Sequence, residues 1–259
     1  MKKIFFILLL AAFPFVNNAQ EKVTQTIDES ISKAVADSAY INNDFASAVA
    51  IYETILQQDG ESANIYYNLG NSYYKMDNIA KAILNYEKAL LLNPGDEDIL
   101  FNLQLAQSKT VDKVIPISEM FFVTWAKSFT NAMSEKGWSK MGIMAFILFL
   151  CFLSLYFFGK KIILKKIGFI SAGFLLVICI IANVCASTQK EKIMKHEYAI
   201  IMAPSITVKS TPNDKGTDLF ILHEGHKVMI KDDTMKEWKE IQLEDGNTGW
   251  VPVELIEII

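Results

Sequence analysis

Arginine is absent from this chain, so every one of its 25 basic residues is a lysine. Paired recognition of phosphates and base edges depends largely on the planar guanidinium group, which lysine lacks. Acidic residues also outnumber the lysines, 29 to 25, which gives a net charge of −4. We therefore do not expect the chain to bind nucleic acid.

Cysteine and histidine are also scarce. All three cysteines, Cys151, Cys179 and Cys185, lie inside apolar runs, where cysteine acts as a small hydrophobic residue. No C-x-x-C pair occurs, so neither a disulfide framework nor a zinc site is predicted. His223 and His226 flank Glu224 at a predicted turn, where they could hold a metal weakly, but a solvated loop is the simpler interpretation.

The usual sequence signatures of enzymes are missing as well. The chain has no glycine-rich phosphate loop and no G-x-S-x-G nucleophile turn. No nucleophile and base are paired outside the apolar runs. We predict a protein that is not an enzyme, and assign it no catalytic, cofactor-binding or metal-binding residues.

Charge is distributed in three blocks. Residues 20–118 contain 14 acidic residues and 7 lysines, residues 119–196 contain 3 and 10, and residues 197–259 contain 12 and 6. A basic, apolar middle thus separates two acidic ends. This pattern predicts two polar domains joined through a membrane anchor.

The N-terminus has the pattern of a secretory signal. Lys2 and Lys3 precede an apolar stretch of 13 residues, 4–16, and Ala19 is a small residue suited to a cleavage point. The stretch is too short to span a bilayer comfortably. We predict a signal peptide over residues 1–19.

Two longer uncharged runs lie in the middle of the chain. Residues 141–159 and 167–189 contain 19 and 23 residues without a charge, and at 1.5 Å per residue each can cross a hydrocarbon layer of about 30 Å. We predict transmembrane helices at 139–159 and 167–187, joined by a lysine-rich loop, 160–166, which should stay in the cytoplasm. With the signal peptide, this places both polar domains in the periplasm, on a bacterial inner (plasma) membrane.

A further helix is predicted just before the first span. Phe122, Trp125, Phe129 and Met133 recur every three to four residues, with Lys127 among the polar residues between them. The spacing predicts an amphipathic juxtamembrane helix within residues 115–138 that lies on the membrane surface. The alternative is that it extends the preceding helical stack.

Helical periodicity dominates residues 28–108. One 34-residue window carries a spaced set of small, aromatic and helix-ending residues: Tyr66, Leu69, Gly70, Tyr73, Ala82, Tyr86, Ala89 and Pro94. This is the pattern of the tetratricopeptide repeat (TPR), in which the small residues let two antiparallel helices approach closely. We predict a TPR domain over 20–114, with repeats at about 30–62 and 63–96 and a capping helix at 97–109.

In the peptide-binding modules that these repeats resemble, the first helices of each pair together form the surface that holds the peptide. The candidate partner groove contains Lys33, Tyr67, Asn68, Asn71, Tyr74, Phe101 and Asn102. A carboxylate clamp is rejected because Asp37 and Asp98 would repel a carboxylate. The groove suits an apolar or basic segment, although its tyrosines could instead simply pack between helices.

The C-terminal region changes to short alternating runs. About five strands separated by turn residues are predicted in 197–259. Together with the turn at Gly249–Pro252 they resemble a bacterial SH3-like barrel, an all-β fold. Trp238 and Trp250 form the candidate ligand face, with core anchoring as the alternative, and such domains often accompany cell-wall enzymes, which makes peptidoglycan a candidate ligand.

The order of these parts, and five short strings, carry a resemblance over the whole chain. The strings are Asn68–Tyr74, Asn93–Asp98, Val111–Lys113, Val208–Pro212 and Gly216–Phe220. They resemble the BatE family, the TPR proteins of the Bacteroides-aerotolerance (Bat) operon. The resemblance implies partnership with Bat-type membrane proteins that carry von Willebrand domains and with a MoxR-type AAA ATPase, and a link to oxidative or envelope stress.

Two functional hypotheses remain. The first is a non-enzymatic, membrane-anchored scaffold that uses its TPR and SH3-like domains for protein–protein interaction. The second is a peptidoglycan-binding envelope protein that recruits a cell-wall enzyme.

Overall fold

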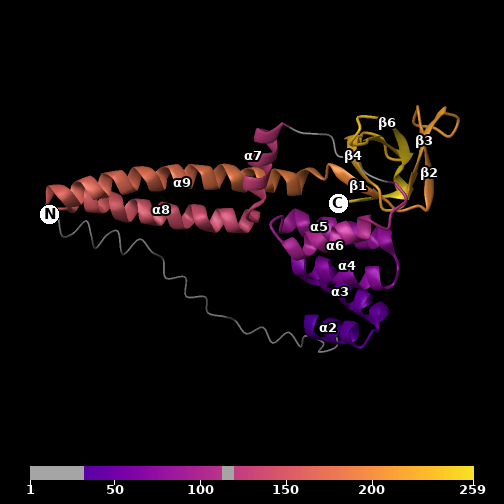
Figure 1. Cartoon of the computed structure of the whole chain (residues 1–259), viewed down its shortest axis with the longest axis horizontal. Coiled ribbons are helices and arrows are strands. Elements are labelled where there is room, and N and C mark those ends of the chain that lie inside the picture. The colour runs from indigo at the N-terminus through magenta and orange to yellow at the C-terminus, as the bar shows by residue number, and fades with distance from the viewer. Residues whose placement is uncertain (1–31, 113–119) are drawn as a thin grey trace. The chain divides into compact units, whose positions relative to one another are not determined.

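The computed structural model describes residues 32–112 and 120–259 (Figure 1). The predicted signal peptide, 1–19, and the first part of the predicted juxtamembrane segment lie outside the described residues. Three kinds of structure follow in order: a helical repeat region, two long apolar helices, and an antiparallel sheet. The predicted multi-domain class is confirmed.

Five helices form the described part of the repeat region. They are α2 (Lys33–Ile41), α3 (Phe45–Asp59), α4 (Ala63–Lys75), α5 (Ile79–Leu92) and α6 (Glu97–Gln107). Asp44 and Asn78 cap α3 and α5 by accepting backbone N–H groups, a role that suits short polar side chains. One repeat length apart, Asn43 and Asp77 adopt positive φ angles of 61° and 60° in the turns between paired helices.

Small residues explain the close packing of α4 against α5. A Cβ added at Gly70 would lie 2.7 Å from two ring atoms of Tyr86. Ala82 and Ala89, on the facing helix, are fully buried. The glycine and alanine positions of the repeat pattern are therefore set by helix–helix distance.

The middle of the chain forms three helices. They are α7 (Phe121–Asn131), α8 (Glu135–Phe158) and α9 (Ile162–Lys195). Only residues 159–161 separate α8 from α9, so Lys165 and Lys166 of the predicted loop belong to the first turns of α9.

Helices α8 and α9 pack along each other (Figure 1). The packing uses small buried residues, among them Gly142, Ala145, Gly168, Ala172 and Ala182. The most apolar windows of α8 and α9 are only 11% and 17% buried. Both helices are long and apolar enough to cross a membrane.

The C-terminal region is one antiparallel sheet. Its strands are β1 (Tyr198–Ile201), β2 (Ser205–Lys209), β3 (Asp218–His223), β4 (Lys227–Asp232), β5 (Trp238–Gln242), β6 (Thr248–Pro252) and β7 (Ile256–Ile258), with a 3₁₀ turn, η1 (Val253–Leu255), before the last. The order is β3-β2-β6-β5-β4-β1-β7, so β3 and β7 are its edges and the sheet is not closed.

The sheet has seven strands where about five were predicted. The predicted runs correspond to β2, β4, β5, β6 and β7, so strands β1 and β3 were missed. The core of the sheet consists of aliphatic side chains from all seven strands: Ala199, Ile201, Ile206, Val208, Leu222, Val228, Ile241, Val251 and Ile256.

Candidate functional site

A small cavity opens where α2 and α4 lie side by side in the repeat region. Its volume is about 260 Å³, and it is lined by Asp37, Tyr40, Ile41, Tyr52, Asn68 and Asn71. Two residues of the predicted partner groove, Asn68 and Asn71, therefore lie at this cavity. We call the face formed by α2, α4 and α6 the groove side.

Asp37 organises the polar floor of this cavity. Its carboxylate accepts hydrogen bonds from Lys33 Nζ at 2.6 Å, Tyr52 Oη at 2.6 Å and Asn68 Nδ2 at 3.2 Å. Burial alone would raise the pKa of the Asp37 carboxyl, but the bonds from Lys33 and Tyr52 outweigh it and hold that pKa below its usual value. The cavity thus contains a carboxylate at neutral pH.

The predicted groove residues Tyr67, Asn71 and Asn102 join helices to one another. Asn102 Nδ2 donates to Tyr67 Oη at 2.9 Å, and the ring of Tyr67 lies 6.1 Å from that of Tyr86. Tyr86 Oη donates to Asn71 Oδ1 at 2.7 Å. For Tyr67 the structure therefore supports the packing interpretation that was left open.

Two predicted groove residues lie apart from the cavity. The first is Tyr74, at the end of α4. Its ring centre lies 4.3 Å from the Nζ atom of Lys109, which follows the C-terminal end of α6. Phe101, on α6, is 65% exposed, and Ile41, at the end of α2, is 76% exposed. The groove side thus combines an anionic cavity with exposed apolar side chains at both ends.

Sequence reasoning missed Tyr40, Ile41 and Tyr52 as residues of the cavity. Tyr52 lies one repeat length, 34 residues, before Tyr86, so the repeat pattern alone assigns it to packing between helices. Asp37 was noted only as a group that excludes a carboxylate ligand, whereas it binds three side chains. The sequence did offer one signal for the cavity: Asp37 is a polar residue of α2 that faces α4, the first helix of the next repeat.

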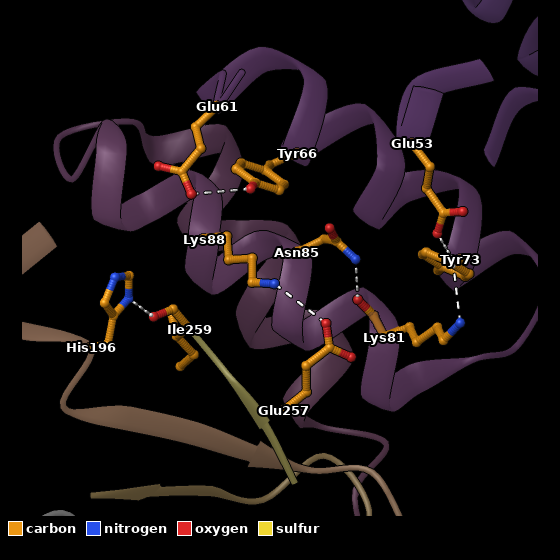
Figure 2. Close-up of polar contacts among 10 residues, drawn as sticks. All are labelled: Glu53, Glu61, Tyr66, Tyr73, Lys81, Asn85, Lys88, His196, Glu257 and Ile259. Carbon is orange, nitrogen blue, oxygen red and sulfur yellow. Dashed lines mark hydrogen bonds and ion pairs between the residues drawn. The ribbon is translucent and has the colours of Figure 1, made fainter. Parts of the chain in front are cut away.

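The repeat-pattern tyrosines Tyr66 and Tyr73 lie on the other side of α4 (Figure 2). With Leu69 and residues of α3 and α5 they line a second cavity, of about 350 Å³. Tyr73 donates its hydroxyl to Glu53, and Tyr66 donates to Glu61 at 3.3 Å. Burial, and then the Glu61 charge, raises the pKa of Tyr66 to about 12. These tyrosines stay neutral and serve the packing of the repeats.

Helix α5 carries the contacts with the C-terminal sheet. Lys227 Nζ on β4 lies 2.6 Å from a carboxylate oxygen of Glu87, whose side chain is only 10% exposed. Lys88 Nζ lies 3.4 Å from Glu257 on β7 (Figure 2). A Cβ added at Gly225 would meet Ile83 Cδ1 at 3.0 Å. We call this the sheet side of the repeat region.

Asp112, just after the repeat region, binds the turn between β3 and β4. Its carboxylate lies 2.8 Å from His223 Nδ1 and accepts the His223 backbone N–H at 2.7 Å. His226 Nδ1 lies 4.0 Å from the same carboxylate, and it is buried without a hydrogen-bond partner among the described residues. The His226 side chain is 10% exposed, so the solvated-loop interpretation is wrong for this residue.

No cluster that could hold a metal ion occurs within residues 32–112 and 120–259. Burial lowers the pKa of His226, while Asp112 opposes that shift. Because Asp112 follows α6 and both histidines lie at the β3–β4 turn, these three residues form a contact between the repeat region and the sheet.

The two predicted tryptophans of the ligand face lie on neighbouring strands. Trp238 is paired with Pro252 and Trp250 with Glu240, so the two indoles lie diagonally on one face of the sheet. Trp238 lines a cavity of about 480 Å³ with Pro212, Asn213, Asp214, Met235, Lys236 and Glu237. Trp250 does not line this cavity, so only one tryptophan faces a recess there.

Comparison with known proteins identifies one module. Residues 63–96 match the tetratricopeptide repeat family. No curated protein matches the chain in sequence. The chain therefore contains a TPR repeat at α4 and α5, a module for protein–protein interaction rather than for catalysis.

Proposed function

We propose that this protein is a non-enzymatic, membrane-anchored scaffold whose groove side binds a segment of a partner protein. Helices α8 and α9 form the anchor. The repeat region and the C-terminal sheet lie on the extracytoplasmic side of a bacterial inner membrane, and the sheet provides a second interaction surface.

The observation that carries this proposal is the difference between the two sides of the repeat region. The sheet side of α5 is covered by the chain's own β4 and β7 through Glu87–Lys227 and Lys88–Glu257. The groove side retains a cavity and two exposed apolar side chains, Ile41 and Phe101. An exposed apolar side chain of this size forgoes about 1.5–3 kcal/mol of burial, which a partner can recover.

The chemistry of the groove side favours a segment with both a basic and an apolar residue. Asp37 supplies the negative charge, and its side chain is 35% exposed. Its ion pair with Lys33 is a surface pair, worth at most about 1 kcal/mol. A lysine or arginine of the partner can therefore replace Lys33 at little cost.

The location follows from the lysine pattern. Lys160, Lys161, Lys165 and Lys166 cluster at the short connection between α8 and α9. Short, lysine-dense connections stay in the cytoplasm, and the predicted signal peptide independently exports the residues that follow it. Both arguments place the opposite ends of α8 and α9 outside, although those ends carry lysines too. The repeat region and the sheet are attached to those ends.

The partners follow from the resemblance rather than from the fold. Strings such as Asn93–Asp98 resemble the BatE family. On that basis the partners are the Bat-type membrane proteins with von Willebrand domains, in a complex linked to aerotolerance or envelope stress.

The test is crosslinked purification of the full-length protein from its native membrane. Ile41→Asp and Phe101→Asp alter only exposed groove-side side chains, and Met76→Asp changes an exposed side chain (46%) at the end of α4. We expect the partner to be lost with the first two variants and kept with Met76→Asp. Equal recovery with all three would reject the groove as the binding site.

One observation favours a second candidate function, peptidoglycan binding. The cavity beside Trp238 combines an aromatic wall with amide and carboxylate groups from Asn213, Asp214 and Glu237, a lining suited to a polar ligand. Isolated peptidoglycan should then retain the protein and release Trp238→Ala. If both proteins pass through the wall material unretained, this candidate is rejected.

A further inference from the structure

Helix α7 presents aromatic side chains that the described chain leaves largely exposed. Phe121 is 85% exposed, Trp125 72%, Phe122 54% and Phe129 44%. At 3.6 residues per turn these four side chains fall within one sector of the helix, opposite Lys127 and Asn131. Phe129 packs against Trp138 of α8, with ring centres 5.4 Å apart, whereas the rest of this apolar face stays mostly exposed among the described residues.

The opposite face of α7 is fixed at its C-terminal end. Trp138 Nε1 and Gln189 Nε2 both donate to the Thr130 carbonyl oxygen at 2.9 Å. Gln189 and Lys192 also donate to Asn131 Oδ1, at 3.1 and 3.0 Å. Gln189 is 2% exposed, so these bonds are well shielded. The direction of α7 is thereby set by α8 and α9.

That direction is across the hairpin rather than along it. Figure 1 shows α7 running across α9, which it contacts near the end of α9 that leads to the sheet. If α8 and α9 cross a bilayer, a helix that runs across them lies close to the membrane plane.

The level of α7 along the hairpin is marked by lysines. The ends of α8 and α9 that hold Trp138 and Gln189 carry Lys136, Lys140, Lys190, Lys192 and Lys195. Between these lysines and the connection that joins α8 to α9, both helices are apolar and their side chains are mostly exposed. Helix α7 thus lies where lipid headgroups meet hydrocarbon, the level at which tryptophan is enriched and amphipathic helices bind.

We propose that the occupant of the apolar face of α7 is the lipid bilayer itself, with Phe121, Phe122, Trp125 and Phe129 immersed at the headgroup–acyl boundary of the outer leaflet. This inference rests on the membrane anchoring in the proposed function. It adds a third membrane contact, which is continuous with the exposed apolar surface of α8 and α9 and lies parallel to the membrane.

This contact also sets the position of the repeat region. A Cβ added at Gly95, in the loop between α5 and α6, would lie 2.9 Å from the Ala132 carbonyl oxygen and 3.1 Å from that of Asn131. The second repeat therefore contacts the end of α7 backbone to backbone. A helix held in the interface then holds the groove at a fixed distance from the lipid.

The test is photocrosslinking of the full-length protein in its native membrane. Benzoylphenylalanine replaces one residue at a time: Trp125 on the apolar face of α7, Thr124 on its polar side, Phe149 within α8, and Trp238 in the sheet. Trp125 and Thr124 are exposed, so the fold tolerates both replacements. Mass spectrometry distinguishes lipid adducts from protein adducts.

We expect lipid adducts at positions 125 and 149, several-fold above those at positions 124 and 238. Lipid adducts at 149 but a protein adduct or none at 125 would overturn the α7 inference and leave the anchor intact. Absence of lipid adducts at 149 would reject the membrane anchor, and with it the proposed function.

Discussion

The two sides of the repeat region use the same kind of ion pair for different purposes. On the sheet side, Glu87 is 10% exposed and pairs with Lys227 of the chain's own β4. On the groove side, Lys33 and Asp37 are 49% and 35% exposed. A buried carboxylate depends on its partner, whereas an exposed one can exchange it. Burial, rather than charge, therefore distinguishes the structural side from the side available to a partner.

The largest expected effect is the loss of the buried pair. Lys227→Met leaves the Glu87 carboxylate, 10% exposed, without its cation. Because Lys227 itself is 31% exposed, the cost lies between roughly 1 kcal/mol for a surface pair and about 3–5 kcal/mol for a fully buried one. We expect the contact between the repeat region and the sheet to open, with faster hydrogen exchange in α5 and β4. Lys231→Met, at an exposed position of β4, is the control and should leave exchange unchanged. Equal exchange in both variants would contradict the structural role of the pair.

A smaller loss is expected within the repeat itself. The added Cβ in Gly70→Ala would lie 2.7 Å from ring atoms of Tyr86, which is 1% exposed and cannot move aside. Such overpacking costs about 1–3 kcal/mol. Thermal unfolding of the repeat region should report it. Gly173→Ala, where an added Cβ meets nothing within 4 Å, is the control, and a shift as large in the control would remove the packing explanation.

The sheet side should also respond to pH. Burial depresses the pKa of His226 in the folded protein, so the unfolded state binds more protons once the pH falls below about 6.5. The stability that depends on neutral His226 is present above that pH and decreases below it. Asp112, Glu244 and Asp245 oppose the shift, and His223 shares the Asp112 carboxylate.

Hydrogen exchange of the turn between β3 and β4 measures this response. After correction for the intrinsic amide exchange rate, which is itself slower at pH 5, we expect less protection from exchange at pH 5 than at pH 7 in the native chain. His226→Leu, which has no proton to gain, should abolish most of the difference. A variant that keeps the full pH response would show that another group controls it.

The smallest effect on stability is expected on the groove side. Lys33→Ala removes an exposed pair and should change the unfolding free energy by less than about 1 kcal/mol. It also frees Asp37 for an incoming basic residue, so recovery of the crosslinked partner should increase. Reduced recovery would mean that Lys33 itself contacts the partner.

The repeat could be predicted because its residues are fixed by local spacing. Gly70, Ala82 and Ala89 are small for a reason that acts within one helix pair, and their positions alone indicate the pattern. The apolar lengths of α8 and α9 are likewise a property of the local sequence. The connection between α8 and α9 was less predictable, since Lys165 and Lys166 lie in the first turns of α9 and not in a loop.

Strands β1 and β3 were missed because neither alternates polar and apolar residues. Residues 199–201 in β1 are all buried, directly after an apolar helix. In β3, Leu219 and Ile221 are exposed although they are apolar. The contact of Asp112 with His223 joins residues far apart in the sequence, and no local pattern contains that information.

Photocrosslinking from the two sides of the repeat region tests the central claim most directly. Benzoylphenylalanine is placed at Ile41 on the groove side or at Lys88 on the sheet side, in the full-length protein in its native membrane. The account predicts an adduct with a second protein from position 41 and an internal crosslink to the C-terminal sheet from position 88. An adduct with a second protein from position 88, with none from position 41, would contradict it.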